Sequence, residues 1–384
     1  MPKLFAAARI VALLMLSLAA MAGCGTRSIG SLSSAERWKP VRVSDPGPGK
    51  HPEVYTDIDF VDAQDGWAAV LAPALPIPEP RLIRTSDGGQ TWADQGVSGV
   101  SLDFVSERLG WAVERTSAGA KVGRTLDGGT SWNWHDVRGH GLLWLAAISA
   151  NEVWAIGERE GSYTLLRTQD GGQSWEAVRH PLSEEPNVLL LGLAFRDPKH
   201  GWVLAERRRT SPGTRRLFVL LTRNAGETFE VCATPGVPDV EWGSLPARIA
   251  FPTEREGWIA CGSSALLRTT DGGKTWAAIT PLVSSNRVSL VDCSFPDRFT
   301  GWAVGAEWDR LPDKRAVAVV TGDGGKTWRR VSTGAEEIED GHLTRVVFVD
   351  TEHGWIAGEG GIVPSDFPVQ QRPHMISFIL KYIP

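Results

Sequence analysis

Few side chains in this 384-residue sequence have the types and spacing that catalysis needs. Three carboxylates, Asp57, Asp59 and Asp103, lie in two similar segments, VYTDIDF and VSLDF, and two carboxylates in one open pocket can act as the acid and base of glycoside hydrolysis. The histidines form no HExxH motif, and no Cys-x-x-Cys pair indicates a metal site. We therefore predict no catalytic residue, no metal and no cofactor. The alternative to a non-enzymatic protein is a carbohydrate-active protein, either a glycosidase or a glycan-binding protein.

A cluster of arginines stands out because the chain is mildly acidic, with 40 Lys and Arg against 45 Asp and Glu and a formal net charge of −5. This balance argues against nucleic acid, since phosphate contacts need a basic surface. The cluster lies in the segment ERRRTSPGTRR and comprises Arg207, Arg208, Arg209, Arg215 and Arg216. With Trp242 and Trp308 in two other long loops, it has the composition of a protein-binding surface. We predict that these seven residues bind a protein client; a solvated hairpin tip is the alternative.

These side chains are positioned by a repeated unit. The segment RTSDGGQTW at 84–92 recurs in closely similar form at 124–132, 167–175, 268–276 and 321–328, and as the degenerate TRNAGETF at 222–229. A Phe followed seven residues later by a Trp occurs six times, and Ala147 with Trp154 takes the same place once; the first pair is Phe60 and Trp67. The seven tryptophans are 43 to 56 residues apart. Each unit is too short to bury a core alone, so the pattern predicts a repeat architecture.

Each unit divides into four short strands, and its Asp-Gly-Gly segment is a strong hairpin signal. Seven units of four antiparallel strands predict an all-β, seven-bladed β-propeller over residues 37–384. The turn aspartates are predicted to bond backbone N–H groups of their own turns in a structural role: Asp87, Asp127, Asp170, Asp271 and Asp323. The last unit has no such turn, so we predict that Arg37–Val43 pairs with Met375–Ile383 and closes the seventh blade.

Alignment of the inner strands on the Phe position places four charges of blades five, six, seven and one in one column: Arg248, Asp292, Arg345 and Asp57. Inner strands converge on the axis, so we predict an ion-pair chain in that order at the mouth of the central channel. Its role is expected to be structural, with ligand binding as the alternative. Four arginines that precede the Asp-Gly-Gly turns form a second set. They are expected either to face a client as a basic ring or to pair with neighbouring carboxylates: Arg84, Arg124, Arg167 and Arg268.

The N-terminus has the features of an export signal. Residues 1–23 combine a basic start with a short apolar stretch, and Met21-Ala22-Gly23-Cys24 is similar to a bacterial lipobox. We predict a lipidated Cys24 followed by a Gly/Ser-rich tether over 24–36, which would place the propeller on a membrane outside the cytoplasm. The remaining cysteines lie in apolar strands and are expected to be buried free thiols: Cys232, Cys261 and Cys293.

The repeated segment S/T-x-D-G-G-x-T/S-W resembles the Asp box, or bacterial neuraminidase repeat, and with the Phe/Trp units it is most similar to the photosystem II stability/assembly-factor family. The resemblance covers about residues 37–384. It implies a non-enzymatic extracytoplasmic scaffold that holds a membrane-protein client during assembly, and leaves that client unidentified. We expect such a scaffold to act as a monomer.

Overall fold

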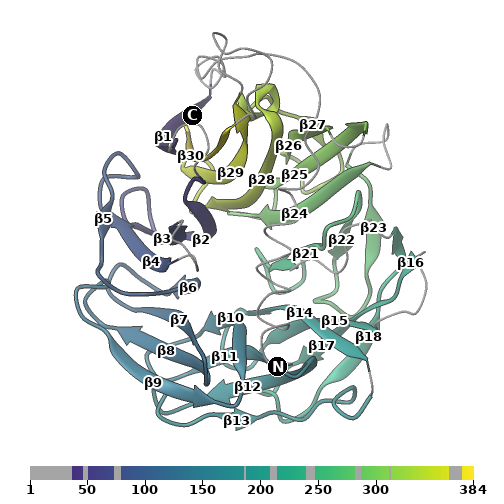
Figure 1. Ribbon diagram of the computed structural model, residues 1–384. Coiled ribbons are helices and arrows are strands. Elements are labelled where there is room, and N and C mark those ends of the chain that lie inside the picture. Colours follow the sequence, from purple (N-terminus) through teal and green to yellow (C-terminus); the bar gives the residue numbers. More distant parts are fainter. Residues whose placement is uncertain are drawn as a thin grey trace.

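A computed structural model of the chain describes residues 37–45, 51–72, 79–185, 187–207, 214–238, 247–281, 287–310, 313–362 and 374–384. These residues form seven four-stranded antiparallel sheets that radiate from a central axis (Figure 1). The predicted seven-bladed, almost entirely β propeller is thereby confirmed. The predicted leader, Cys24 and the tether lie outside the described residues.

Blades one to four follow the repeat from its inner strand outward. Blade one contains β2 (Val54–Phe60), β3 (Gly66–Ala72), β4 (Glu79–Thr85) and β5 (Ala93–Asp94). Blade two contains β6 (Ser101–Phe104), β7 (Gly110–Thr116), β8 (Gly119–Thr125) and β9 (Asn133–Arg138). Blade three contains β10 (Gly141–Ala147), β11 (Val153–Arg159), β12 (Ser162–Thr168) and β13 (Glu176–Ala177). Blade four contains β14 (Val188–Phe195), β15 (Gly201–Arg207), β17 (Leu217–Thr222) and β18 (Glu230–Ala233).

The remaining blades complete the ring. Blade five contains β20 (Arg248–Ala250), β21 (Gly257–Ala260), β22 (Leu266–Thr269) and β23 (Ala277–Ile279). Blade six contains β24 (Val288–Ser294), β25 (Gly301–Arg310), β26 (Asp313–Thr321) and β27 (Arg329–Arg330). Blade seven contains β28 (Glu339–Phe348), β29 (Gly354–Ile362), β30 (His374–Tyr382) and β1 (Trp38–Ser44). The short 3-10 helix η3 (Ala335–Glu337) precedes β28, and the described part of the chain has no helix long and apolar enough to cross a membrane.

The N-terminal strand closes the seventh blade. β1 runs antiparallel to β30, with Trp38 opposite Tyr382 and Ser44 opposite Ser377. The indole of Trp38 is fully buried, and its ring centroid lies 5.4 Å from that of Trp302 in blade six. β1 is also bonded to blade one, because the Arg42 guanidinium donates to Glu53 at 2.8 Å and to the Tyr55 hydroxyl at 2.9 Å. The predicted closure is confirmed.

The Phe and Trp of the repeat hold neighbouring blades together. The Trp on the second strand of one blade stacks on the Phe of the next: the Trp67 and Phe104 ring centroids are 3.6 Å apart, and so are those of Trp355 and Phe60. Four further interfaces are built in the same way, by Trp154 with Phe195, Trp202 with Phe251, Trp258 with Phe295 and Trp302 with Phe348. The core therefore lies between the blades as much as within them.

The Asp-box turns are closed by their own side chains. In blade one, Asp87 Oδ1 accepts the Thr91 N–H at 2.8 Å, and Asp87 Oδ2 accepts the Thr91 hydroxyl at 2.6 Å. Thr85 Oγ1 accepts the Gly89 N–H at 2.8 Å, and Gly89 has a φ of 93° that favours glycine. The hydrogen bonds from the hydroxyl and the N–H of Thr91 lower the pKa of Asp87 to about 2. The equivalent bonds recur at the other four turn aspartates: Asp127, Asp170, Asp271 and Asp323.

Loss of β1 should destabilise the whole ring. We expect deletion of residues 25–43 to lower the melting temperature sharply, because it exposes a strand edge in blade seven and removes the buried Trp38. Trp38→Ala alone should cost about 3–5 kcal/mol of unfolding free energy, the usual range for truncating a buried Trp. Deletion of residues 25–36, which retains β1, is the control. If the 25–43 deletion melts like the intact chain in circular dichroism, the closure contributes nothing to stability.

Candidate functional site

Four charged side chains of the inner strands meet around the propeller axis, and we call them the axial cluster: Asp57, Arg248, Asp292 and Arg345. Asp57 on β2 is 3% exposed and accepts hydrogen bonds from Arg248 of blade five and from Arg345 Nε of blade seven, the latter at 3.3 Å. Arg248 Nε also lies 3.9 Å from Asp292 Oδ1. The cluster therefore ties blades one, five, six and seven together.

Two of the three contacts in the predicted chain are present, Arg248 with Asp292 and Arg345 with Asp57, but the order differs because Arg248 also pairs with Asp57. Arg345 bonds Asp57 and the carbonyl oxygen of Thr56 at 2.8 Å, whereas Asp292 accepts the backbone N–H of Val346 at 2.9 Å. Arg248 rather than Arg345 contacts both carboxylates. The reason is the length of the Arg248 side chain, which lets this residue of blade five bond Asp57 of blade one, a blade that is not its neighbour in the ring.

The inner-strand aspartates also connect adjacent blades through backbone bonds. Asp59 Oδ2 accepts the Phe104 N–H at 2.6 Å, and Asp103 Oδ2 accepts the Ala147 N–H at 2.7 Å. Ser294 Oγ accepts the Phe348 N–H at 2.9 Å in the same register. This function was missed from the sequence, although a polar residue directly before the repeat Phe is a visible signal. Asp59 and Asp103, two of the three carboxylates considered for glycoside hydrolysis, therefore have a structural role.

Burial and charge act in opposite directions on these carboxyl groups. Burial would raise the pKa of Asp57, but the charges of Arg248 and Arg345 hold it below its ordinary value. Burial raises the pKa of Asp103 to about 6, and burial together with the charge of Asp103 raises the pKa of Asp59 well above its ordinary value. Burial also raises the pKa of Asp292, although Arg248 and Arg345 act against it. The axis therefore holds one firmly ionised carboxylate, Asp57, and three that retain protons more readily.

The second arginine set is engaged in contacts within the ring. Arg84 pairs with Asp65 at 2.9 Å, Arg167 with Glu152 at 2.6 Å and Arg268 with Glu256 at 3.8 Å. Arg124 donates to the carbonyl oxygen of Ala150 at 2.7 Å. Each guanidinium also lies 4.9–5.9 Å from the centre of the second-strand Trp ring of its own blade. The structure thus favours pairing over a basic ring presented to a client.

The loops between second and third strands and the blade connectors share one face, which we call the variable face. On it, β16 (Thr214–Arg215) pairs with β19 (Val237–Pro238), so the Arg-rich segment and the connector that carries Trp242 are joined by a two-stranded ribbon. Arg207 pairs with Glu185 and lies 5.3 Å from the centre of the Phe218 ring, and Arg216 is exposed. Arg208, Arg209, Trp242 and the side chain of Arg215 lie outside the description.

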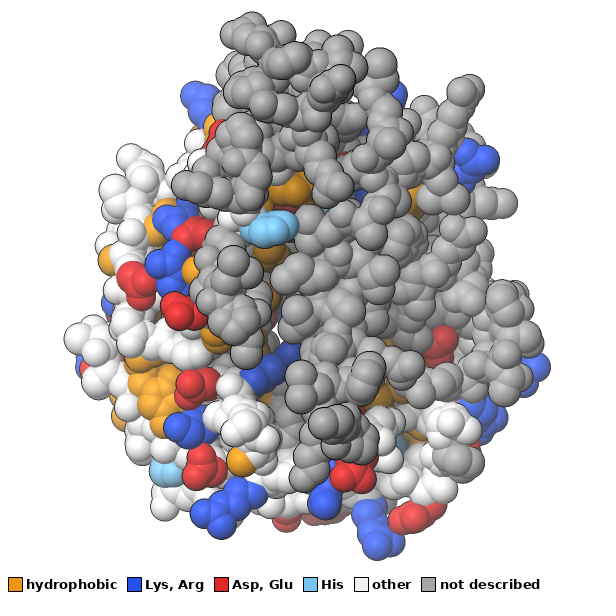
Figure 2. Space-filling view, viewed as in Figure 1, with side chains coloured by type: hydrophobic (Ala, Val, Ile, Leu, Met, Phe, Trp, Pro, Cys, Tyr) orange, Lys and Arg blue, Asp and Glu red, His pale blue; other side chains and the backbone are white. Residues whose placement is uncertain are grey.

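The prediction that Trp308 lies in a loop is wrong. It lies in β25, opposite Lys314 of β26, and its side chain is half-buried. The long loop expected around Trp308, over Glu307–Arg315, is instead a continuation of the β25–β26 hairpin, with Glu307 opposite Arg315 and Arg310 opposite Asp313. Around the lower rim of the view in Figure 2, Lys and Arg side chains alternate with Asp and Glu.

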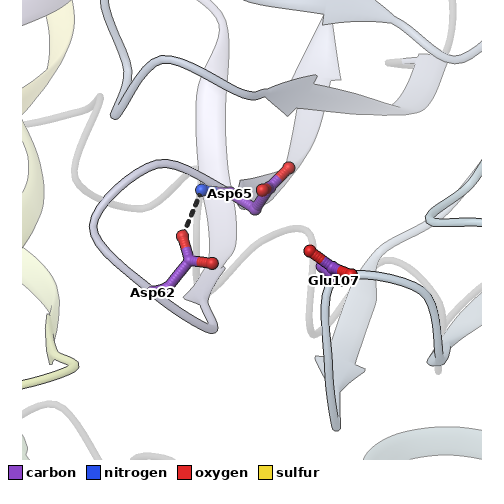
Figure 3. Close-up of side chains that lie close together, drawn as sticks. All are labelled: Asp62, Asp65 and Glu107. Atoms are coloured by element: carbon purple, nitrogen blue, oxygen red, sulfur yellow. Dashed lines mark hydrogen bonds between the residues drawn. The ribbon is translucent and has the colours of Figure 1, made fainter.

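One group of acidic side chains has the spacing of metal ligands. Asp62 and Asp65 come from the β2–β3 turn and Glu107 from the β6–β7 turn, with one oxygen of each within 4.8 Å of the others (Figure 3). Asp62 Oδ1 already accepts the N–H groups of Gln64 and Asp65, each at 2.7 Å, and Asp65 pairs with Arg84. We assign no metal to this cluster, because two of its three carboxylates have partners.

Comparison with known proteins gives partial sequence matches. No protein-family model matches the chain. A stretch of 107 residues is 35% identical to the chloroplastic photosystem II stability/assembly factor HCF136 of Oryza sativa subsp. japonica and covers 27% of this chain and 23% of that protein. A similar match to the Arabidopsis thaliana protein of the same name is 33% identical and covers 25% of it. The matches span about a quarter of the relatives, and over this stretch the predicted resemblance is confirmed.

Solved structures match over nearly the whole chain. YCF48 bound to a D1 peptide has a TM-score of 0.60 at 18% identity, covering 91% of this chain and 96% of that one. YCF48 from Cyanidioschyzon merolae has a TM-score of 0.58 at 18% identity, covering 91% and 99%. At this level of identity the likeness establishes the propeller fold.

Removal of the central arginine should destabilise the propeller. Arg248→Ala leaves two buried carboxylates, Asp57 and Asp292, with one cation fewer, and we expect it to cost about 3 kcal/mol in urea denaturation. Arg345→Ala removes one contact to Asp57 and should cost less. Arg298→Ala, whose side chain is 59% exposed, should stay within about 0.5 kcal/mol of the wild type. Equal stability of all three variants would show that the axial cluster does not stabilise the ring.

The raised pKa of Asp103 predicts a pH dependence of stability. Because the folded protein holds this proton more tightly than the unfolded chain, the stabilising contribution is complete below pH 3.8 and is lost as pH rises to about 6. Asp103→Asn keeps an oxygen acceptor for the Ala147 N–H without the titration. Its stability relative to the wild type should therefore rise across this window, by at most about 1.4 kcal/mol per pH unit. Parallel stability curves for the two proteins between pH 4 and 7 would contradict this.

Proposed function

We propose that this protein is a non-enzymatic scaffold that binds a protein client in the manner of an assembly factor. The observation that carries the proposal is the β16–β19 ribbon, which joins the Arg-rich segment to the blade connector on the variable face. Guanidinium groups form strong, directional hydrogen bonds with carboxylates, so this surface suits an acidic segment of the client. The YCF48 structure with a bound D1 peptide supports a protein client for a propeller of this fold.

The repeated polar residues support the proposal because they already make contacts within the scaffold. The Asp-box aspartates close their turns, the axial cluster ties four blades together, and the second arginine set contacts the blade interfaces. Groups held in this way are not free to bind a client without loss of stability. The loops of the variable face differ in sequence from blade to blade, and variable loops on a rigid scaffold commonly carry recognition.

The location of the scaffold is a proposal from the sequence. The apolar leader and Cys24 support a lipid anchor on the extracytoplasmic face of a membrane, with the tether over 24–36 leading to the propeller. Such an anchor would bring the binding surface to membrane-bound clients. The client itself, expected to be a membrane or extracytoplasmic protein, is defined here only by its acidic segment.

A carbohydrate-active propeller is the second candidate. The observation in its favour is the raised pKa of Asp59 and Asp103, because a glycosidase acid must hold a proton near neutral pH. Each of these groups already bonds a backbone N–H of the next blade through Oδ2. Hydrolysis of a soluble glycan that is lost in Asp103→Asn would favour this candidate over the scaffold.

Neutralising the Arg-rich segment should weaken client binding without loss of stability. We expect a variant with Ser at 207, 208, 209, 215 and 216 to melt like the wild type, since surface substitutions seldom change stability much. Its binding to an acidic peptide should weaken, and its remaining affinity should depend less on salt because fewer ion pairs are screened. Titration by fluorescence anisotropy at two salt concentrations measures both effects. Retained affinity and salt dependence would remove this surface from the proposal.

The anchor can be tested separately. Cys24→Ser should move the protein from the membrane fraction to the soluble extracytoplasmic fraction, because the acylated thiol is lost. Mass spectrometry of the N-terminal peptide should show acyl chains on Cys24 in the wild type. An unmodified Cys24 in membrane-bound protein would contradict the lipid anchor and leave the client surface unaffected.

A further inference from the structure

We propose that the propeller rests on the lipid bilayer with its Asp-box face and holds the variable face away from the membrane. The Asp-box face is the side formed by the turns between first and second strands and between third and fourth strands of each blade. This inference rests on the proposed lipid anchor at Cys24. Two independent observations carry it: the point at which the chain enters the fold, and the distribution of exposed apolar side chains.

The chain enters the propeller on the Asp-box face. Trp38 is opposite Tyr382 at the end of β30, and the Ile383 N–H donates to the carbonyl oxygen of Arg37 at 2.7 Å. Lys381 lies opposite Trp355 just as Arg84 lies opposite Trp67, so Tyr382 occupies the position of Thr85, which begins the Asp-box turn of blade one. The residues before Arg37 therefore reach β1 where the other blades have that turn.

The length of the tether limits how far this entry point can lie from the bilayer. Residues 25–36 separate Cys24 from Arg37. A segment of this length spans at most about 40 Å at full extension. A bilayer at the variable face would require it to pass back along a blade, whose seven-residue strands are about 23 Å long. The entry point on the Asp-box face needs no such detour.

Exposed apolar side chains gather on the same face. Among the described residues, six large hydrophobic side chains are exposed, and four of them belong to the Asp-box face: Val105 at 44%, Leu126 at 52%, Phe299 at 53% and Ile383 at 36%. Val105 and Phe299 lie in turns between first and second strands, and Leu126 lies in the Asp-box turn of blade two. The Arg298 guanidinium lies 5.0 Å from the centre of the Phe299 ring.

These side chains suit the interfacial region of a bilayer. An exposed Phe or Leu gains free energy when it enters the headgroup boundary, and an adjacent Arg can extend its charge to the phosphates. The same turns also carry acidic residues, such as Asp62, Glu107 and Asp297. We therefore propose that this face makes only shallow apolar contact with the bilayer, and that the lipid anchor supplies the attachment.

Collisional quenching tests the orientation. A fluorophore is placed on Lys326→Cys, in the Asp-box turn of blade six, or on Ala118→Cys, at the exposed end of the β7–β8 hairpin on the variable face. The native thiols of the propeller are buried and should not react. The lipidated full-length protein is bound to phosphatidylcholine vesicles that contain lipid with a nitroxide on its headgroup. We expect several-fold stronger quenching at 326 than at 118; equal quenching, or the reverse order, would overturn the proposal.

A second arm separates the orientation from the lipid anchor. A hexahistidine in place of Cys24, with residues 25–384 unchanged, attaches the same tether to nickel-chelating lipid in the same vesicles. If Cys24 proves to be unmodified but the 326 label is still preferentially quenched here, the anchor fails and the orientation stands. If Cys24 is acylated and the two labels are quenched equally, the anchor stands and the orientation fails.

Apolar substitutions test the contact itself. Leu126→Ser combined with Phe299→Ser should reduce quenching at 326 toward the level at 118, because the side chains that enter the interface are gone. Val231→Ser removes a comparably exposed side chain from the outer strand β18 and should leave quenching unchanged. Equal effects of the double variant and the control would show that these side chains do not contact lipid.

Discussion

The ring depends on the aromatic stack between adjacent blades. A second-strand Trp lies on the Phe of the following blade at six of the seven interfaces, and the Gly before each Trp leaves room for the Phe ring of its own blade; a Cβ on Gly66 would come within 2.2 Å of Phe60. Blade three is the exception. Ala147 replaces its Phe, and Val153 stands in place of the Gly. The Trp111 indole still donates to a backbone carbonyl oxygen of that blade, Ser149 at 3.2 Å, as the stacked Trp67 does to Gly128 of blade two. The two substitutions compensate in volume, as packing at constant density requires.

Polar contacts then secure the parts of the ring that aromatic packing does not reach. Near the axis, Asp59, Asp103 and Ser294 accept backbone N–H groups of the next blade. Arg248 crosses to Asp57, so the charges that are removed from water find partners. The cost is visible in the raised pKa values of Asp59 and Asp103, where burial is not offset by a cation in contact.

Residues that build the scaffold differ from those proposed to bind the client. Residues that recur in each blade are occupied by the turns, the stacks and the axis, so recognition falls to segments that occur once. The Arg-rich segment and the blade connector are far apart in the sequence of blade four, yet β16 and β19 bring them to one place on the variable face. If the opposite face rests on the membrane, this surface is the one that a neighbouring membrane protein can reach from the aqueous side.

The sequence by itself determined the number of blades, the Asp-box turns and the closure by β1, because repeat spacing and turn chemistry are local and recur in register. It also indicated that Arg248, Asp292, Arg345 and Asp57 share one level of the axis. The predicted order of charges also gave the Arg248–Asp292 and Arg345–Asp57 contacts. Only the tertiary structure showed that Arg248 pairs with Asp57 as well, because a flexible guanidinium can reach across the axis to a blade that is not its neighbour. The tertiary structure likewise shows that Trp308 lies in β25 rather than in a loop, and that β16 pairs with β19. Such contacts depend on distances between distant segments, and spacing along the chain does not encode them.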